Sequence, residues 1–358
     1  MTLDLLLLKS QPSTMYRTFL PFLFLLSSIS TQAERPNIIL VFIDDMGWGD
    51  FSCFGNEHAK TPHIDRLAKE GLRFDQFYVN SPICSPSRVA ISTGQYPQKW
   101  KITSYLSNRD HNKKRGMAQW LDPKAPMLAR SLQKSGYATG HFGKWHLNGL
   151  RGPGAPIFKE DSHHPGAFGF DEWLSVTNFF DRNPIMSRKG KIEEYSGDSS
   201  EIIVDEALKF IKANATANKP FFTVIWYGTP HDPWTAAKAD KKSFTKLSQK
   251  AQEHYGELVA MDRSIGTLRK GLREMGVAQN TLVWFMSDNG GLPRLDPPTT
   301  GGLRSFKGSM YEGGLRVPAI IEWPKGISKI RITKHPAGAV DIFPTIAEVA
   351  GLEKSDLL

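Results

Sequence analysis

The chain has 358 residues, of which 40% are hydrophobic and 23% are charged. This length suits one large domain or two smaller ones with a sizeable buried core, and the composition excludes collagen, a coiled coil and an intrinsically disordered chain. The formal charge of +9 would suit a polyanionic partner but is equally typical of a solvated surface. No run of Lys and Arg is interleaved with aromatic residues, so nothing indicates nucleic-acid binding.

Residues 1–33 have the layout of a secretory signal peptide. Arg17 precedes an apolar run at 19–26, and a small, polar stretch ends at Ala33. The run is shorter than the roughly 20 residues that span a bilayer. We therefore expect cleavage, a mature domain over 34–358, no stable membrane insertion, and export to a periplasmic, secreted or lysosome-like location. An uncleaved membrane anchor is the alternative.

Three near-continuous apolar segments predict buried strands, and each runs directly into polar residues. Strands of this kind belong to a sheet that is covered on both faces. The segments are 37–43 before Asp44 and Asp45, 221–227 before Gly228 to His231, and 281–286 before Ser287 to Asn289.

Helical patterns lie between these strands. From Leu258 to Met275 apolar residues recur at steps of three and four, and Gly276 follows. Weaker helical patterns cover 64–70, 125–135, 201–212 and 341–350. Strands that alternate with helices indicate an α/β fold, in which chemistry gathers at the carboxyl ends of the strands. The stretch 148–200 is rich in Gly, Pro and His, so we expect a long irregular loop region near the site.

Two pairs of oxygen-bearing residues follow predicted strands. Asp44 and Asp45 end the first, and Asp288 and Asn289 end the last. On a regular strand adjacent side chains point to opposite faces, but at a strand end both can turn toward one cation. Three carboxylates and one amide oxygen suit Ca²⁺ or Mg²⁺ rather than Zn²⁺. The alternative is that both pairs simply form turns.

Cys84 is one of only two cysteines, with Cys53, and lies just before Pro86. Proline favours the first turn of a helix, so Cys84 would sit at a helix N-terminus, where an anion is stabilised. Arg88 adds a positive charge nearby. The residues thus predict an activated thiol beside an oxyanion site; the alternative is a small buried cysteine, or a disulfide with Cys53.

The segment Cys84-Ser85-Pro86-Ser87-Arg88, followed by Thr93-Gly94, resembles the sulfatase signature Cys-x-Pro-Ser-Arg with its trailing Thr-Gly. Further segments resemble that family's motifs in the expected order, from about residue 35 to 351. They are 44–47, 143–147, 229–233, 287–290, 307–308 and 311–318. Asn148 departs from the pattern, because a glycine often stands there. The chain also ends at Leu358, where family members usually continue into a smaller C-terminal subdomain, so we expect a truncated chain.

The resemblance implies an α/β fold of the alkaline phosphatase superfamily: a sandwich with a central, mostly parallel sheet flanked by helices, here without its C-terminal subdomain. It implies that a formylglycine-generating enzyme oxidises Cys84 to formylglycine (3-oxoalanine). It also implies one cation, Ca²⁺ with Mg²⁺ as the alternative. The implied ligands are Asp44, Asp45, Asp288, Asn289 and the modified residue 84.

The resemblance also implies a mechanism in which the hydrate of residue 84 attacks sulfur. Arg88 and Lys144 would hold residue 84 and offset negative charge, and either His231 or Lys307 would protonate the leaving alcohol. His146 would then take a proton so that sulfate is expelled. Because Lys144 and His146 are two apart, both would face the same side of an extended segment. The alternative for these residues is surface lysines and satisfied loop histidines.

Together these expectations describe an arylsulfatase-like sulfuric ester hydrolase. The basic charge and expected export favour a sulfated carbohydrate over a simple aryl sulfate as substrate. Two alternatives stay open: a phosphonate or phosphate ester hydrolase of the same superfamily, and an inactive, truncated protein that binds sulfated glycans.

Overall fold

The structure is a computed structural model that describes residues 35–149 and 155–353. The predicted signal peptide lies outside these ranges. Within them, no helix combines the length and the apolar character needed to cross a membrane.

A ten-stranded mixed sheet forms the centre of the described chain. The strand order is β11 (Arg331–Thr333), β2 (Leu72–Phe74), β10 (Ala319–Glu322), β9 (Thr281–Ser287), β1 (Asn37–Ile43), β8 (Phe221–Trp226), β4 (Ala138–Lys144), β5 (Glu172–Val176), β6 (Ile185–Arg188) and β7 (Lys191–Glu194). Five strands, β9, β1, β8, β4 and β5, run parallel to one another, and antiparallel pairings occur on either side of them. A second, two-stranded parallel sheet pairs β12 (Ala337–Gly338) with β3 (Phe77–Tyr78).

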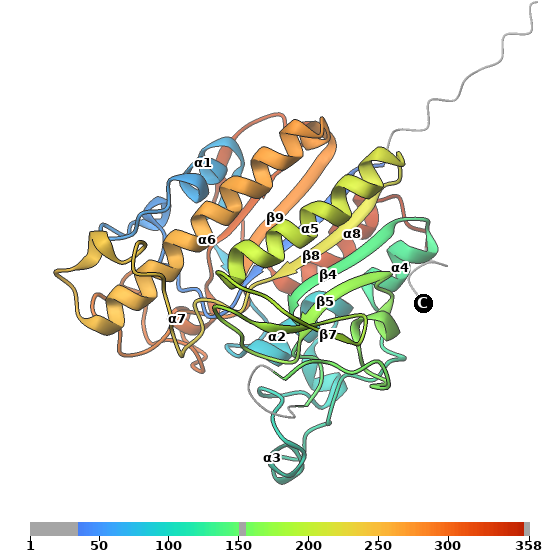
Figure 1. Ribbon diagram of the computed structural model, residues 1–358, viewed down its shortest axis with the longest axis horizontal. Coiled ribbons are helices and arrows are strands. Elements are labelled where there is room, and N and C mark those ends of the chain that lie inside the picture. Colours follow the sequence, from blue (N-terminus) through green and yellow to red (C-terminus); the bar gives the residue numbers. More distant parts are fainter. Residues whose placement is uncertain (1–34, 150–154, 354–358) are drawn as a thin grey trace, which may run out of the picture. The chain divides into compact units, whose positions relative to one another are not determined.

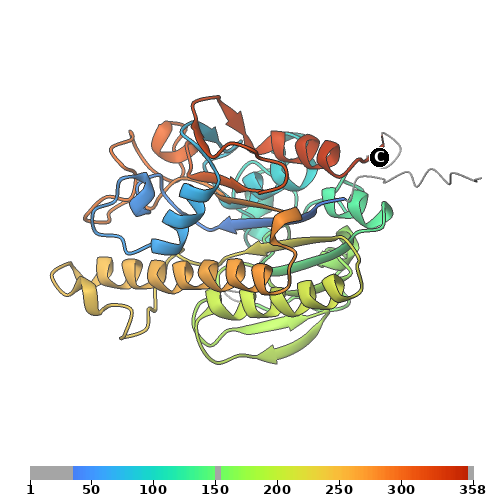
Figure 2. The same cartoon turned by 90° about the horizontal axis from the view of Figure 1, so that it is seen from above.

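Helices cover both faces of the large sheet (Figures 1 and 2). One face carries α1 (Pro62–Glu70), α5 (Ser199–Thr216) and α6 (Gln249–Glu274). The other carries α2 (Cys84–Thr93), α4 (Leu128–Lys134) and α8 (Ile342–Val349). The short helices α3 (Arg109–Lys114) and α7 (Glu312–Leu315) lie outside these two layers. Short 3-10 helices cover Ser52–Phe54, Pro97–Trp100, Pro165–Phe168, Lys242–Phe244, Ala278–Asn280 and Ala339–Asp341.

The alternation of side chains along β1 explains the two cores. Leu40 and Phe42 pack with the apolar residues of α2, α4 and α8, while Val41 and Ile43 pack with those of α1, α5 and α6. Because successive side chains of a strand point to opposite faces, one uninterrupted apolar segment can serve both layers.

The α/β fold predicted from the sequence is confirmed, with two corrections. Residues 148–200 are not irregular throughout, because they contain β5, β6 and β7. The central strand β4 was missed, since its sequence interrupts the apolar run with glycines. One of these, Gly143, has a φ of 110°, and a Cβ there would lie 1.9 Å from the carbonyl oxygen of Trp226. The close approach of β4 and β8 therefore requires glycine at position 143, and this glycine interrupts the apolar pattern by which a buried strand is recognised.

Candidate active site

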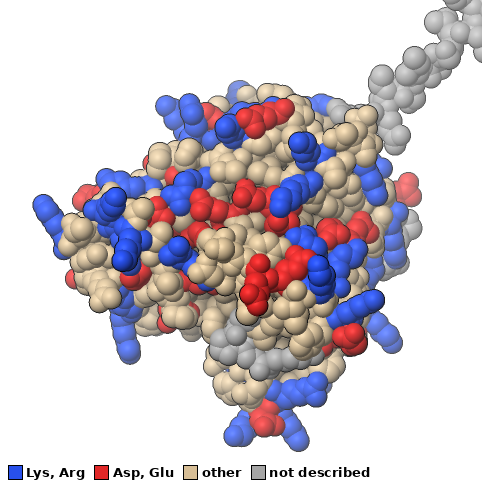
Figure 3. Space-filling model, in the orientation of Figure 1, with Lys and Arg blue, Asp and Glu red and all other residues tan. Residues whose placement is uncertain are grey.

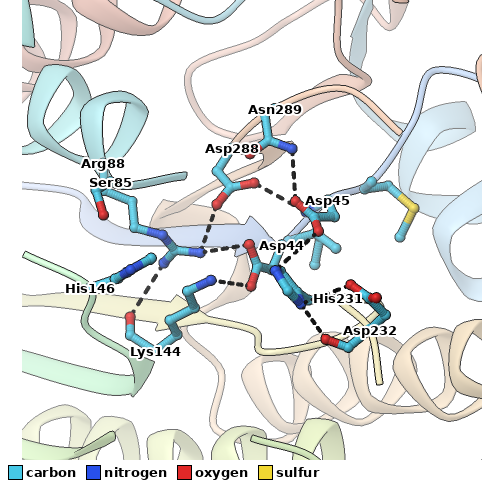
Figure 4. A network of polar contacts seen from close by, with 12 residues as sticks. Asp44, Asp45, Ser85, Arg88, Lys144, His146, His231, Asp232, Asp288 and Asn289 are labelled. Carbon is cyan, nitrogen blue, oxygen red and sulfur yellow. Dashed lines mark hydrogen bonds and ion pairs between the residues drawn. The ribbon is translucent and has the colours of Figure 1, made fainter. Parts of the chain in front are cut away.

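The predicted site residues converge at the carboxyl ends of the middle strands (Figure 4). This is where ligands bind in open α/β sheets. Asp44 and Asp45 follow β1, Cys84 and Arg88 lie on α2, Lys144 ends β4 with His146 two residues on, His231 follows β8, Asp288 and Asn289 follow β9, and Lys307 precedes α7.

A turn at Asp45 brings the two adjacent aspartates to one side. Asp45 has a φ of 63°, a left-handed conformation that aspartate tolerates better than most residues. Its backbone N–H donates to the Oδ1 atom of Asp288 at 3.1 Å. Carboxylate oxygens of Asp44, Asp45 and Asp288 lie within 4.8 Å of one another, and all three residues are buried. Because the chain leaves the extended conformation at Asp45, the side chains of Asp44 and Asp45 do not point to opposite faces as they would on a regular strand.

Two buried oxygens in this cluster have no hydrogen-bond partner: Oδ1 of Asn289, and Oδ1 of Asp44, which has only an ion pair with Arg88 at 3.5 Å. The amide of Asn289 is oriented by its Nδ2 atom, which donates to Asp45 at 2.9 Å, and this leaves its oxygen directed elsewhere. Unpaired buried oxygens are costly, and oxygen-only donors are what a hard divalent cation requires. The residues present therefore fit the predicted Ca²⁺ or Mg²⁺.

Three buried or partly buried cations balance the three carboxylates. The Nη2 atom of Arg88 lies 2.8 Å from Asp288 and 3.5 Å from Asp44. Lys144 pairs with Asp44, and the Nζ atom of Lys307 lies 2.5 Å from Asp45. In formal charges the six side chains sum to zero, so the cluster can be buried without an ion.

The pKa values of these groups follow from the same contacts. Burial alone would raise the pKa of Asp44, but Lys144, His231 and Arg88 together hold it well below the ordinary value. Burial and the neighbouring Asp44 raise the pKa of Asp288. The pKa of Lys307 is raised, because attraction to the aspartates outweighs its burial.

Arg88 occupies the centre of the network. Its side chain is 0% exposed, its Nη1 atom donates to the carbonyl oxygen of Lys144 at 3.3 Å, and its guanidinium lies 4.9 Å from the ring centre of Trp226. This stacking on β8 was not predicted, since Trp226 had been assigned to the strand only as an apolar residue.

Cys84 is the first residue of α2 and is only 3% exposed. It is a free thiol and is not bonded to Cys53. Burial raises the pKa of Cys84, although Lys144 and Lys307 oppose the shift. Burial therefore works against the predicted activated thiol, since it disfavours the charged form of the unmodified side chain.

His146 is held in one tautomer. Its Nε2 atom lies 2.9 Å from the carbonyl oxygen of Leu106, which can only accept, so Nε2 carries the proton. Its Nδ1 atom is buried and has no partner. Burial, with Lys144, lowers the pKa of His146 well below its ordinary value, so the ring is neutral and its Nδ1 atom is unprotonated. The expected extended segment is wrong, because His146 has a φ of 48°.

His231 and Lys307 are the two site residues that reach the surface. Their side chains are 16% and 17% exposed. The Nε2 atom of His231 lies 3.5 Å from Asp45, its Nδ1 atom lies 2.5 Å from the carbonyl oxygen of Asp232, and its ring stacks on Phe179.

Two carboxyl groups of α6, one buried and one partly exposed, anchor the loop that carries His231. Glu257 accepts from the N–H of Thr235 at 2.7 Å, and Glu253 accepts from the N–H of Ala236 at 2.9 Å. Burial, together with Asp181, raises the pKa of Glu257 well above its ordinary value. Neither glutamate was predicted. Both precede Leu258, where the predicted helix began, so the apolar pattern gave no signal for them.

Known proteins resemble this chain in sequence and in fold. A sequence profile of the family described as Sulfatase matches residues 36–352. N-acetylgalactosamine-6-sulfatase of Sus scrofa is 33% identical over 89% of this chain and 63% of its own length. Arylsulfatase A of Homo sapiens is 30% identical over 89% of this chain and 65% of its own length. The chain therefore spans less than two thirds of these relatives. The crystal structure of Ps i-CgsB in complex with k-i-k-neocarrahexaose is 30% identical and matches with a TM-score of 0.79, over 90% of this chain and 74% of that one.

Proposed function

Because the chain belongs to the sulfatase family, we propose that it is a sulfuric ester hydrolase acting on sulfate monoesters of a carbohydrate. The observation that carries the proposal is the buried set of carboxylate and amide oxygens facing the residues around Cys84. Support for a carbohydrate comes from N-acetylgalactosamine-6-sulfatase among the relatives and from the oligosaccharide complex among similar structures.

We propose that Cys84 is oxidised to formylglycine by a separate formylglycine-generating enzyme, and that the aldehyde hydrate is the nucleophile. The raised pKa of the thiol supports this, since an unmodified Cys84 is a poor nucleophile at neutral pH. Asp44, Asp45, Asp288 and Asn289 would hold a divalent cation together with residue 84. When bound, the cation would lower the pKa of a hydroxyl on residue 84 and offset sulfate charge.

The chain's own side chains supply the remaining steps. Arg88 and Lys144 keep their carboxylate partners fixed and place positive charge beside the sulfate. Either His231 or Lys307, whose side chains reach the surface, would protonate the leaving alcohol. The free Nδ1 atom of His146 accepts a proton from residue 84 when sulfate is expelled.

The first 33 residues, which lie outside the described ranges, have a signal-peptide pattern, so we propose export and a catalytic domain that begins at residue 34. Export is compatible with the modification, which would precede arrival at the final compartment.

Two measurements test the proposal. Mass spectrometry of the peptide containing Cys84 from active protein should show formylglycine, and the same preparation should hydrolyse 4-nitrophenyl sulfate faster than phenyl phosphonate or a phosphodiester analogue. Full turnover with an unmodified thiol would exclude the nucleophile. A preference for the phosphonate would favour the phosphonate or phosphate ester hydrolase, and ligand binding without turnover in modified protein would favour a glycan-binding role.

A further inference from the structure

We propose that residues 99–120, called the basic lobe below, bind anionic groups of a sulfated polysaccharide beside the sugar whose ester is cleaved. The inference rests on the proposed sulfatase function and extends it from one ester to a polymeric substrate.

The basic lobe is a segment that projects from the main body and has a defined backbone conformation. The N–H of Ala118 donates to the carbonyl oxygen of Lys101 at 2.9 Å, so the two ends of the excursion meet. Between them α3 extends away from the sheet (Figure 1). The buried side chain of Asn112 bonds to both the N–H and the carbonyl oxygen of Ser107 at 2.8 Å. The lobe therefore presents its side chains on a defined backbone.

The lobe carries far more positive than negative charge. It contains six cations and one carboxylate, that of Asp110. None of the six forms an ion pair with any carboxylate of the described chain, whereas Arg188, Arg263 and Arg269 each bind two or more. The six are Lys99, Lys101, Arg109, Lys113, Lys114 and Arg115. In the orientation of Figure 3, Lys and Arg gather around a single acidic group at the tip below the main body. Such uncompensated charge is offset by a polyanion.

The lobe also touches the reaction centre through its own backbone. The N–H of Leu106 donates to the Oγ atom of Ser85 at 2.9 Å, next to Cys84, and its carbonyl oxygen fixes the tautomer of His146. Arg109 is three residues further on, so its Cα lies within about 11 Å of that of Leu106. A polymer held by the lobe would therefore be only a few sugar rings from the scissile ester.

The aromatic residues of the lobe favour a glycan over a nucleic acid. The Trp120 ring is stacked on His163 at 4.7 Å, and the Arg109 guanidinium lies 6.0 Å from its centre, so this ring is not a free platform for bases. Tyr105 is 39% exposed but its ring already contacts Arg115 at 4.6 Å. Single-strand binders need open aromatic faces, whereas sulfate groups need cations alone.

The test compares two double variants with the same charge change. Lys113→Ala/Lys114→Ala removes two exposed cations of α3. Lys212→Ala/Lys219→Ala removes two exposed lysines, one on α5 and one just before β8, which begins at the end of the sheet opposite the site. Dextran sulfate is the probe, first as an inhibitor of 4-nitrophenyl sulfate hydrolysis and then as an immobilised ligand eluted with NaCl.

At low ionic strength we expect the inhibition constant of dextran sulfate to rise about fivefold in the lobe variant, since exposed ion pairs are individually weak. The difference should shrink at 0.15 M salt, where charges are screened, and the control variant should match the wild type. Equal inhibition constants and elution positions for the lobe variant and the wild type would overturn the inference, as would stronger retention of the protein on DNA than on dextran sulfate. If the wild type hydrolyses no sulfate ester, the proposed function fails, while the elution position still decides whether the lobe binds the polymer.

Discussion

Replacing Arg88 with Met tests whether the buried charges at the site depend on one another. Met approximates the length of the arginine stem but carries no charge, so it leaves Asp44 and Asp288 facing the space of the guanidinium. Lys144 still pairs with Asp44, but Asp288 loses its partner at 2.8 Å.

The structure sets the expected magnitude. Removing one partner of a buried ion pair costs about 3–5 kcal/mol, because Asp288 must then either stay charged without a partner or bind a proton. Loss of the contact with Trp226 adds up to about 1 kcal/mol. We therefore expect Arg88→Met to lower the free energy of unfolding by about 4 kcal/mol, a large share of the 5–15 kcal/mol typical of a folded protein. Arg88→Lys keeps the charge and should lose about half as much.

Arg263 provides a matched control. It also binds two carboxylates, Asp240 at 2.9 Å and Glu201 at 2.6 Å, but its side chain is 44% exposed. Because water already solvates these partners, Arg263→Met should cost no more than about 1 kcal/mol.

The assay is urea unfolding followed by tryptophan fluorescence at pH 7, in EDTA and then with added Ca²⁺. In EDTA the four proteins should rank as wild type, Arg263→Met, Arg88→Lys and Arg88→Met in decreasing stability. Calcium should narrow the gap between the wild type and Arg88→Met, because a cation bound to Asp288 offsets the unpaired charge. If Arg88→Met does not yield folded protein, Arg88→Lys carries the comparison. Equal losses for the buried and the exposed arginine variants would refute the reasoning.

Three further predictions concern metal, pH and the loop that carries His231. Asp45→Ala and Asp288→Ala should each lose bound Ca²⁺ and turnover, measured by metal analysis after dialysis and by 4-nitrophenyl sulfate hydrolysis; wild-type metal content in both would count against the site. Burial raises the pKa of Asp198 to about 6, so the folded state holds an extra proton between about pH 4 and 6 and its stability falls as pH rises through that range. Asp198→Asn should therefore gain about 2 kcal/mol over the wild type between pH 4 and 7 in urea titrations, and a constant difference would contradict this. Glu257→Gln should change stability and kcat little, because the wild-type carboxyl is held neutral by its raised pKa, whereas Glu257→Ala should lower kcat by freeing Thr235; equal kcat in both variants would argue against anchoring.

The elements that could be predicted from the sequence are the buried strands, because burial on both faces gives them a continuous run of apolar residues. Strands β1, β8 and β9 are uninterrupted apolar runs, and the structure places them within one residue of the expected bounds. The helix expected from Leu258 begins nine residues earlier, at Gln249, because its first turns carry polar residues that anchor neighbouring loops. Strands β6 and β7 have no apolar alternation, because β7 is mostly exposed and the two buried residues of β6 are a Met and a Ser.

The site residues were predictable because each stands next to a recognisable strand end or in a family motif. Their mutual geometry was not. The left-handed turns at Asp45 and His146 depend on partners more than a hundred residues away or on loop packing, as with the bond from Asp45 to Asp288. The contact between His146 and the Leu106 carbonyl oxygen could not be predicted from the sequence, because every residue type has the same backbone oxygen. Tertiary contacts of this kind do not leave a local signal.

The burial of Cys84 implies that, in the proposed enzyme, oxidation of this residue comes before folding. With 3% of its surface exposed at the foot of α2, its sulfur is closed to any other protein once β1 and β9 have brought their aspartates together. The proposed oxidation by a second enzyme would then have to happen while the chain is still being made or is still unfolded. A chain that folds first would keep the thiol, so the fraction of active molecules would depend on the relative rates of folding and modification and would not change afterwards without unfolding.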